Sequence, residues 1–471
     1  MKKGCLPLLL IMINVCLYGQ IGEHKSVDSI FAEWDSPAVP GAAVGIIDQG
    51  ELIYHRGYGS GDLEHDIAIG PSSVFYLGSV SKQFVTFCIL LLEEEGKLDL
   101  DDEIQKFLPD FPRYEAPLTI RHFIHHTSGV RDYLTLMFLK GRNYLDHIED
   151  EEVYELIKRQ RSLNFAPGEQ YLYSNSCYFM LAMIVEKAAG KTIREFAAEN
   201  IFKPLGMKRT LFYDDNTDLI KDRVFSYGKT AEEQKFNNLI MRFDLVGSGG
   251  VYSCIEDLYL WDQNFYHNKL GKGGQDIIRK MQEEGQLNNG ENCGYAFALN
   301  IGKYKGLKTV GHGGSLAGYR AHMLRFPDQQ FTVIILANRS DADPGRKALQ
   351  LADVFLRDEF IKNDPEVQPE KPAIAGDAEV LADDVPEIEV QEYCGKYFAE
   401  ELNTHYQVVV EDEILKVKIG NYKPMVLTPN GEDQLWVEGA GLLFRFRREE
   451  KQIIGFELDA GRVNNLVFTK D

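Results

Sequence analysis

Hydrophobic residues follow two different periods along the chain. An alternation of apolar and polar positions, typical of half-buried strands, predicts an early hairpin over 42–59 with its turn at Asp48-Gln49-Gly50. The same alternation returns later and predicts strands over 295–304, 307–313, 319–326 and 331–338. The three-to-four-residue spacing of amphipathic helices predicts helices over 27–34, 81–95, 118–126, 151–160, 175–189, 193–200 and 345–361.

This order of elements predicts the fold class and the domains. In the region 25–362, strands at both ends with helices between them indicate an α+β domain: an antiparallel sheet whose first and last strands meet, flanking helices and a helical subdomain. Residues 363–386 are acidic, contain prolines and show little periodicity, which predicts a linker. Residues 387–471 alternate in short segments and predict a small all-β barrel or sandwich.

The first residues are typical of a targeting segment rather than of a folded element. Two lysines are followed by an apolar stretch over 5–16 and then by polar residues. That stretch is too short to cross a bilayer, which needs about 20 residues. Residues 1–20 are therefore predicted to be a cleaved secretory signal, which makes the protein secreted or periplasmic. Two alternatives stay open, an uncleaved anchor and a lipoprotein modified at Cys16, although Val15 is a poor residue before a lipidated cysteine.

Composition and charge exclude several classes of protein. With 471 residues, the chain is long enough for two or more domains. Its 44% hydrophobic and 26% charged residues are typical of a globular protein and exclude a disordered chain or a multi-span membrane protein. Lys and Arg number 51 against 72 Asp and Glu, a net charge of −21, which argues against nucleic acid or anionic lipid as partners. No second long apolar run follows the signal, so no membrane-spanning segment is expected after its removal.

Cysteines and histidines give neither a disulfide framework nor a metal site. Seven cysteines, less Cys5 and Cys16 of the signal, leave five that are far apart and form no Cys-x-x-Cys pair. The histidines at 122, 125 and 126 lie close in sequence but lack the spacing of a zinc motif. We therefore expect no metal and no organic cofactor.

The first candidate for chemistry is Ser79-Val80-Ser81-Lys82, which comes directly before a long apolar helical pattern. Residues three apart share one face of a helix, so Ser79 and Lys82 are expected to be neighbours. A lysine amine whose pKa is lowered can take the proton of a serine hydroxyl and make it a nucleophile. The spacing alone is a weak signal, because Ser226-Tyr227-Gly228-Lys229 repeats it in a polar stretch without a helix behind it.

Two further segments carry polar groups suited to the same chemistry. Tyr173-Ser174-Asn175 comes before a helical pattern; a tyrosine can act as a general base and an asparagine can hold a substrate carbonyl. The structural alternative is a tyrosine packed in a loop, with Ser174 or Asn175 as the helix cap. Tyr266-His267-Asn268 repeats the spacing at the polar end of a predicted helix. Gly311-His312-Gly313-Gly314-Ser315 follows a strand pattern, where glycines allow a substrate to lie close and the Ser315 N–H can help to form an oxyanion hole; the alternative is a glycine-rich turn.

These three segments, in this order and context, resemble the motifs of the serine β-lactamase, penicillin-binding protein and D,D-peptidase superfamily, in its class C β-lactamase-like branch. Two more stretches are similar to that family, namely His126-Thr127-Ser128-Gly129 after a helix, and Gly247–Ser253 followed by Glu256-Asp257-Leu258. The resemblance covers about 25–362. Residues 387–471 resemble the small β-barrel appended to many such hydrolases.

The resemblance implies a role for each motif residue. Ser79 would be the acylated nucleophile, Lys82 would assist its deprotonation, and Tyr173 would be the general base and proton shuttle. Substrate would be bound by Asn175, His312, Gly314 and Ser315, with the N–H groups of Ser79 and Ser315 forming the oxyanion hole.

One position departs from the β-lactamase pattern. Those enzymes usually carry lysine where this chain has His312, and a histidine is mostly neutral at pH 7 unless its site raises its pKa. We therefore expect cleavage of a small peptide, amide or ester through an acyl-enzyme rather than β-lactam hydrolysis. The alternative is a non-catalytic binding or sensor module that keeps the pocket. An α/β-hydrolase would need a Gly-x-Ser-x-Gly segment, which the chain lacks.

The role of residues 387–471 stays open between two hypotheses. In one, the β domain only packs on the catalytic domain. In the other, one of its loops narrows the active-site cleft and sets substrate length. The sequence does not specify the substrate or the oligomeric state.

Overall fold

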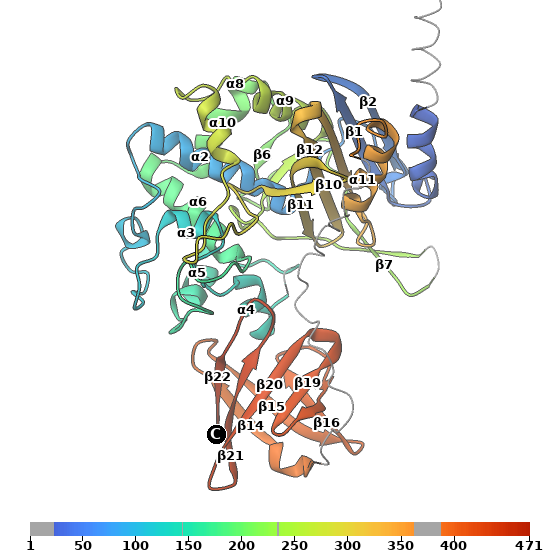
Figure 1. The fold of residues 1–471 in the computed structure, drawn as a ribbon. Coiled ribbons are helices and arrows are strands. Elements are labelled where there is room, and N and C mark those ends of the chain that lie inside the picture. Colours follow the sequence, from blue (N-terminus) through green and yellow to red (C-terminus); the bar gives the residue numbers. More distant parts are fainter. Residues whose placement is uncertain (1–22, 144, 233–234, 362–387) are drawn as a thin grey trace, which may run out of the picture.

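The computed structural model describes two parts of the chain, shown one above the other in Figure 1, and covers residues 23–143, 145–232, 235–361 and 388–471. The predicted signal at 1–20 and the predicted linker at 363–386 lie outside the described residues. The first part mixes helices and strands, and the second is almost entirely strands. The predicted fold class, an α+β domain followed by a small all-β domain, is confirmed.

A six-stranded antiparallel sheet organises the α+β part, in the order β10-β11-β12-β13-β1-β2. Its strands are β1 (Ala42–Asp48), β2 (Glu51–Tyr58), β10 (Asn300–Tyr304), β11 (Leu307–Leu316), β12 (Tyr319–Phe326) and β13 (Phe331–Ala337). Strand β1 pairs with β13, so that Val44 faces Ile335. The early hairpin and the late strands therefore form one sheet, as the alternation at both ends of the region predicts.

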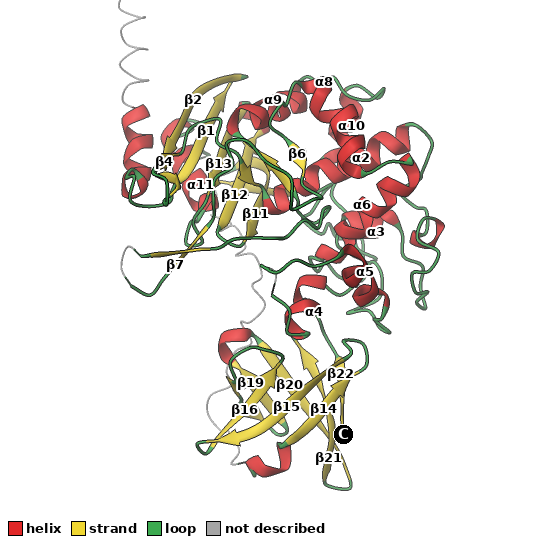
Figure 2. Cartoon of the chain, turned by 180° about the vertical axis from the view of Figure 1, so that it is seen from behind, coloured by secondary structure: helices red, strands yellow, loops and turns green. Residues whose placement is uncertain are grey.

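Both faces of this sheet are covered, so alternate residues of its central strands enter two different cores. Val44 and Ile335 belong to the core under α11 (Pro344–Phe355), which also includes Phe31 of the N-terminal helical segment. Ile47 and Ile334 belong to the larger core on the other face, toward the helices. In Figure 2 the sheet stands between α11 and the helices around α9. Burial on both faces keeps the sheet rigid, and β11 on it carries the third motif.

Helices and short strands fill the region between the two ends of the sheet. The helices are α2 (Lys82–Glu94), α3 (Ile120–Ile124), α4 (Tyr133–Leu139), α5 (Asp150–Lys158), α6 (Asn175–Ala189), α7 (Ile193–Ala197), α8 (Lys203–Leu205), α9 (Ile255–Tyr266) and α10 (Gln275–Met281). The short strands are β3 (Ser60–Asp62), β4 (Ile67–Ala68), β5 (Phe75–Tyr76), β6 (Leu211–Phe212), β7 (Tyr227–Lys229), β8 (Phe236–Asn238) and β9 (Val251–Ser253). Within the described residues, no helix has both the length and the apolar character needed to cross a bilayer.

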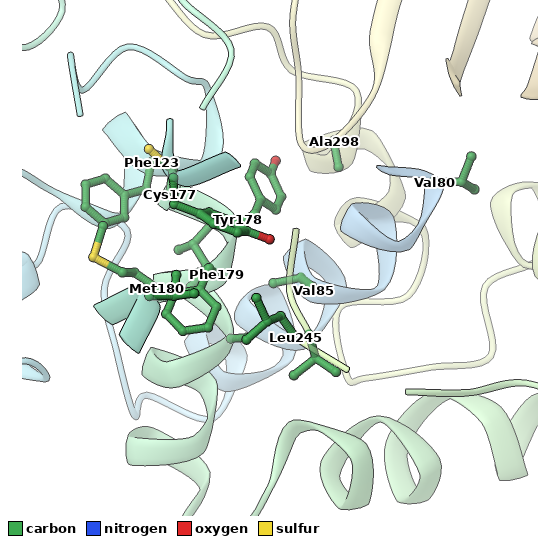
Figure 3. Packing of buried hydrophobic residues seen from close by; sticks show 14 of the residues in the cluster. Val80, Val85, Phe123, Cys177, Tyr178, Phe179, Met180, Leu245 and Ala298 are labelled. Carbon is green, nitrogen blue, oxygen red and sulfur yellow. The ribbon is translucent and has the colours of Figure 1, made fainter. Parts of the chain in front are cut away.

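Helices α2 and α6 form the centre of the larger core. Their sequences are apolar on most sides, and they are buried along most of their length. Figure 3 shows Val85 of α2 beside Leu245, with the side chains of Cys177 and Met180 of α6 in the same cluster. The first two motifs lie where α2 and α6 begin, so packing these helices together brings those motifs together.

The sequence pattern misplaces some elements. Helices α4 and α10, with seven residues each, are not among the predicted ones, because short apolar runs do not distinguish a helix from a strand. The strand predicted from 295 begins only at Asn300. Ala298 has a φ of 58° and the Ala296 N–H donates to the Leu299 carbonyl, so a tight turn interrupts the run. These apolar residues fill the core instead of pairing in the sheet.

The all-β part is one nine-stranded antiparallel sheet that curls into a nearly closed barrel. Its strands are β14 (Gly395–Ala399), β15 (Thr404–Glu411), β16 (Ile414–Ile419), β17 (Met425–Val426), β18 (Thr428–Gly431), β19 (Gln434–Val437), β20 (Leu442–Glu449), β21 (Gln452–Asp459) and β22 (Leu466–Lys470). The edge strands β17 and β18 are neighbours in the chain, so the two edges of the sheet end close together. The interior is aromatic, with Phe456 stacked on Phe468 at 4.5 Å between ring centroids.

Buried polar contacts join the barrel to the α+β part near α4. The Arg131 guanidinium, whose side chain is 0% exposed, donates to Glu401 of the barrel at 3.0 Å. The Tyr406 hydroxyl donates to the Leu139 carbonyl at 2.6 Å. Removing one partner of such a buried pair is costly because it leaves the other charge unpaired. The barrel is therefore held in a defined position on the α+β part.

Candidate active site

Ser79 lies on the turn that leads into α2. Residues Gly78–Ser81 form a 3₁₀ turn, and the α-helix begins at Lys82. Gly78 has a φ of 54°, a conformation that favours glycine, and this lets the chain turn sharply before the serine. The Ser79 hydroxyl is 3.1 Å from the Lys82 amine, so the two residues are neighbours as the three-residue spacing predicts.

Lys82 is fully buried and its amine has three polar neighbours. Besides Ser79, the Nζ atom contacts the Asn175 Oδ1 at 2.9 Å and the Ser248 carbonyl at 2.5 Å. Burial lowers the pKa of Lys82 well below its ordinary value; Arg462 lowers it further, while Asp132 opposes the shift. The site therefore favours the uncharged amine, the form that can accept a proton.

The ring of Tyr173 faces the Lys82 amine. The Lys82 Nζ is 4.8 Å from the centroid of its ring, and the His126 ring packs beside it at 4.2 Å. The Tyr173 hydroxyl is buried and has no well-formed hydrogen bond with any described residue. Burial raises the pKa of Tyr173, and the nearby Ser79 hydroxyl and Arg462 only partly oppose this. The phenol thus keeps its proton near neutral pH, which favours Lys82 over Tyr173 as the base.

Asn175 is the first residue of α6, and the buried Asp132 holds it in place. The Asp132 Oδ2 accepts from the Asn175 backbone N–H at 2.7 Å and from its Nδ2 at 2.8 Å. The Oδ1 of the same carboxylate accepts from the Thr135 N–H at 3.0 Å and caps α4. Since the Asn175 Nδ2 is bonded to Asp132, its Oδ1 must face Lys82. Asp132 therefore fixes the amide that orients the lysine.

We expect Asp132→Ala to lower kcat by about 10–100-fold, as removal of an orienting partner does at other sites. Two donors of Asn175 would lose their acceptor, and the amide would be free to turn away from Lys82. Turnover and thermal unfolding of the variant measure the effect. Thr135→Val is the matched control, because it removes only the 3.3 Å contact of the Thr135 hydroxyl with Asp132. Equal activity of the two variants would contradict this role.

Gly314 and Ser315 lie on β11 against the turn that carries Ser79. A Cβ atom added at Gly314 would be 2.0 Å from the Leu77 carbonyl oxygen and 3.0 Å from the Ser79 nitrogen. A Cβ atom added at Gly78 would be 2.5 Å from the Ser315 nitrogen. Only glycines permit this approach of the two backbones. It brings the N–H groups of Ser79 and Ser315 into one small region, as an oxyanion hole requires.

His312 lies in the site with both ring nitrogens engaged by the protein. Its Nε2 is 3.0 Å from the Tyr295 hydroxyl and its Nδ1 is 2.5 Å from the Gly313 carbonyl, an arrangement in which the Nδ1–H donates. Burial, with the nearby Lys82, lowers its pKa to about 3. His312 is therefore neutral at pH 7 and does not replace the cation that a lysine would supply.

A comparison with known families agrees with the three motifs. The model of the beta-lactamase family matches residues 27–356. The chain belongs to the beta-lactamase family. This confirms the resemblance that the three motifs carry.

The relatives of this beta-lactamase family member include a penicillin-binding protein and D-aminopeptidases. It is 30% identical over 442 residues to penicillin-binding protein 4* of Bacillus subtilis (strain 168), covering 89% of this chain and 93% of that protein. It is 27% identical over 303 residues to a D-aminopeptidase of Gluconobacter oxydans (strain 621H), covering 64% of this chain and 56% of that protein. The chain thus spans little more than half of the D-aminopeptidase.

A solved structure shows the same fold along nearly the whole chain. The octameric penicillin-binding protein homologue from Pyrococcus abyssi superposes with a TM-score of 0.62 at 22% identity, covering 96% of this chain and 99% of that chain. At this identity the likeness concerns the fold alone. It includes the barrel, which the family match does not reach.

The two segments that repeat the motif spacings, Ser226–Lys229 and Tyr266–Asn268, make structural hydrogen bonds and ion pairs away from the site. The Ser226 hydroxyl donates to the Leu239 carbonyl at 3.0 Å, and Lys229 pairs with Asp341 at 3.2 Å. The Asn268 side chain bonds the loop after α9, through the Leu270 carbonyl. Residue spacing alone therefore does not distinguish these segments from the site; their position in the fold does.

Sequence reasoning missed three residues of the site. Asp132 stands alone in a loop and gave no signal. Ser248 lies in the glycine-rich stretch that resembles the family, which could have indicated it. Arg462 belongs to the barrel, yet its guanidinium carbon is 4.8 Å from the centroid of the Tyr173 ring. No periodicity or motif links residue 462 to residue 173, because only the docking of the barrel brings them together.

Proposed function

We propose that this protein is a serine hydrolase that cleaves a peptide or amide bond through an acyl-enzyme on Ser79. The observation that carries the proposal is the Lys82 amine, buried, with its pKa lowered, and 3.1 Å from the Ser79 hydroxyl. A weak nucleophile needs a neighbouring base, and this pair supplies one.

The bonding of Lys82 suits an uncharged amine. Its two N–H groups match the two acceptors, the Asn175 Oδ1 and the Ser248 carbonyl. Its lone pair is then directed at the Ser79 hydroxyl. In acylation, the Ser79 proton moves to Lys82 as Oγ forms a bond to the substrate carbonyl carbon. The carbonyl oxygen becomes an oxyanion held by the N–H groups of Ser79 and Ser315.

Collapse of this intermediate breaks the carbon–nitrogen bond. The leaving nitrogen takes a proton from the Tyr173 hydroxyl, and the Lys82 ammonium gives its proton to the resulting Tyr173 phenolate, which restores the phenol and the uncharged amine. A neutral phenol can donate in this way, which agrees with the raised pKa of Tyr173. In deacylation, water gives a proton to Lys82 and attacks the ester; the Ser79 oxygen leaves and takes the proton back. No metal or cofactor is required.

For the substrate we propose a peptide or amide of a D-amino acid. Support comes from the similarity to the D-aminopeptidase of Gluconobacter oxydans. The neutral His312 argues against recognition of β-lactams through a cation at the third motif. Amide and peptide cleavage share the acyl-enzyme steps above, so the site chemistry serves both.

Hydrolysis of paired D- and L-alanine p-nitroanilides tests the proposal. We expect the D-compound to be cleaved at least about 10-fold faster, because a site that positions one enantiomer misplaces the scissile carbonyl of the other enantiomer. Intact mass after exposure to a serine-acylating probe reports the nucleophile independently. Labelling of Ser79 with no turnover of any amide, ester or peptide would favour the binding-module alternative. Faster cleavage of the L-compound would overturn the proposal that the substrate is a D-amino acid derivative.

A further inference from the structure

A buried arginine of the α+β part is bonded to two separate turns of the barrel. The Arg131 side chain is 0% exposed, and its Nη1 donates at 3.0 Å to Glu401, which lies in the turn between β14 and β15. Its Nη2 donates to the carbonyls of Asn464 and Asn465, in the turn between β21 and β22, at 2.8 and 3.1 Å. The position of the Arg131 guanidinium therefore depends on the docked barrel.

Glu401 supplies the negative charge that balances this arginine. The other side-chain partners of Arg131 are the Gln160 Oε1 and the Ser162 Oγ, both at 3.0 Å, and both are neutral. The Glu401 Oε1 also accepts from the Arg161 N–H at 2.5 Å, so the carboxylate is itself held in place. Removing the partner of a buried charge is strongly unfavourable. Without Glu401, the guanidinium would have to leave its position to reach water.

The segment of Arg131 and Asp132 is also tied to the start of α6. The Arg131 carbonyl accepts from the Ser176 hydroxyl at 2.6 Å. The Asp132 Oδ2 accepts from both N–H groups of Asn175, whose Oδ1 contacts the Lys82 amine at 2.9 Å. Because Arg131 and Asp132 share a peptide bond, a shift of the arginine also moves the carboxylate. The contacts form a continuous path from the barrel to the lysine.

We propose that Glu401 and Arg131 are positioning residues for the reaction. Through them the docked barrel holds Asp132, which in turn fixes the Asn175 amide that orients Lys82. The inference rests on the proposed function, in which Lys82 is the base. The bonds of Glu401 and Arg131 all go to residues outside the three motifs, so their loss should act on the chemical step rather than on substrate binding.

Glu401→Ala tests this inference with whichever of the two alanine p-nitroanilides is cleaved faster. We expect kcat to fall about 5–50-fold while KM changes less than about 2-fold, because a small misplacement of catalytic groups can cost up to about 100-fold. Glu401→Gln should recover part of the loss, because its amide oxygen can still accept from Arg131. If the alanine variant does not fold, the glutamine variant takes its place in every measurement, with smaller changes in the same direction.

Glu400→Ala is the matched control. Glu400 precedes Glu401 in the same turn and pairs with Arg161, but the two side chains of that pair are 67% and 68% exposed. An exposed pair of this kind contributes little, so the control should keep both kcat and KM.

A double-mutant cycle shows whether the effect passes through Asp132. In an Asp132→Ala background, Glu401→Ala should lower kcat by less than about 2-fold further, because the link through which it acts is already lost. A loss of the same size in both backgrounds would overturn the proposal, since Glu401 would then act by another route, such as general destabilisation.

Hydrogen exchange of the Asn175 backbone N–H gives a second measurement, which needs no substrate. This N–H donates to the Asp132 Oδ2, so its protection reports the contact directly. Glu401→Ala should speed its exchange about 10-fold or more while the amides of β1 exchange as in the wild type. Equal exchange of the Asn175 N–H in variant and wild type would overturn the positioning role, whatever happens to kcat. If the wild type cleaves neither compound but the exchange changes as expected, the proposed function fails and the positioning role stands.

Discussion

Ser79→Ala is expected to abolish formation of the acyl-enzyme and to lower kcat by about 10⁴-fold or more, the scale seen when a catalytic nucleophile is removed. The Lys82 amine would keep its bonds to Asn175 and Ser248 but would have no hydroxyl to deprotonate. Little stability should be lost, because the Ser79 side chain is only partly buried and its hydroxyl interacts with Lys82 and Tyr173, which both belong to the site. The variant therefore separates chemistry from folding.

Intact mass after incubation with a serine-acylating probe measures this effect directly, with turnover of the D-alanine compound beside it. Ser226→Ala is the matched control, since Ser226 begins the second Ser-x-x-Lys segment and bonds only structural partners. It should keep both labelling and turnover. Labelling that persists in Ser79→Ala would place the nucleophile elsewhere and refute the assignment.

Lys82→Arg is expected to lower kcat by about 10²–10⁴-fold at every pH, the usual contribution of a general base. Arginine stays protonated, so it has no lone pair to accept the Ser79 proton. Its larger head group must also fit among Ser79, Asn175 and the Ser248 carbonyl. Lys82→Met, which removes the charge and keeps much of the volume, should lose activity as well. An active arginine variant would show that Lys82 acts only as a cation.

The pH profile of the wild type supports the same assignment. Because burial lowers the pKa of Lys82, the amine loses its proton at a lower pH than an ordinary lysine does, and the acid limb of the kcat/KM profile should be shifted down in pH with it. His312 has a pKa of about 3, so it should add no inflection between about pH 5 and 8. A profile that rises only near the ordinary pKa of lysine would contradict the uncharged amine. Circular dichroism across the same range controls for unfolding.

The barrel has a structural role and lies at the site, so the two hypotheses for it are not exclusive. Arg131 and Glu401 hold it against the α+β part, and the same docking brings Arg462 to Tyr173. Point variants are therefore more informative than deletion of the barrel, which would also expose the buried Arg131. A point variant of Arg462 removes a single cation while the Arg131–Glu401 contact of the interface stays intact.

The sequence by itself determined the fold class and the three motifs. Periodicity reports which faces are buried, and the segments at 42–58 and 307–337 alternate clearly enough to predict strands at both ends of one sheet. Ser79 and Lys82 could be paired from their spacing, because three residues make nearly one helical turn. Tyr173, Asn175 and His312 came from motifs whose order matches a family, and the fold brings them to one place.

Only the tertiary structure decided the charges and the partners in the site. The pKa values of Lys82, Tyr173 and His312 depend on burial, which a motif does not encode. Asp132 acquires its role when α4 and α6 meet, and Arg462 when the barrel docks. Local patterns specify elements because neighbouring residues share a helix turn or a strand face. Contacts between residues hundreds of positions apart depend on how whole elements pack, and that information appears only in the folded chain.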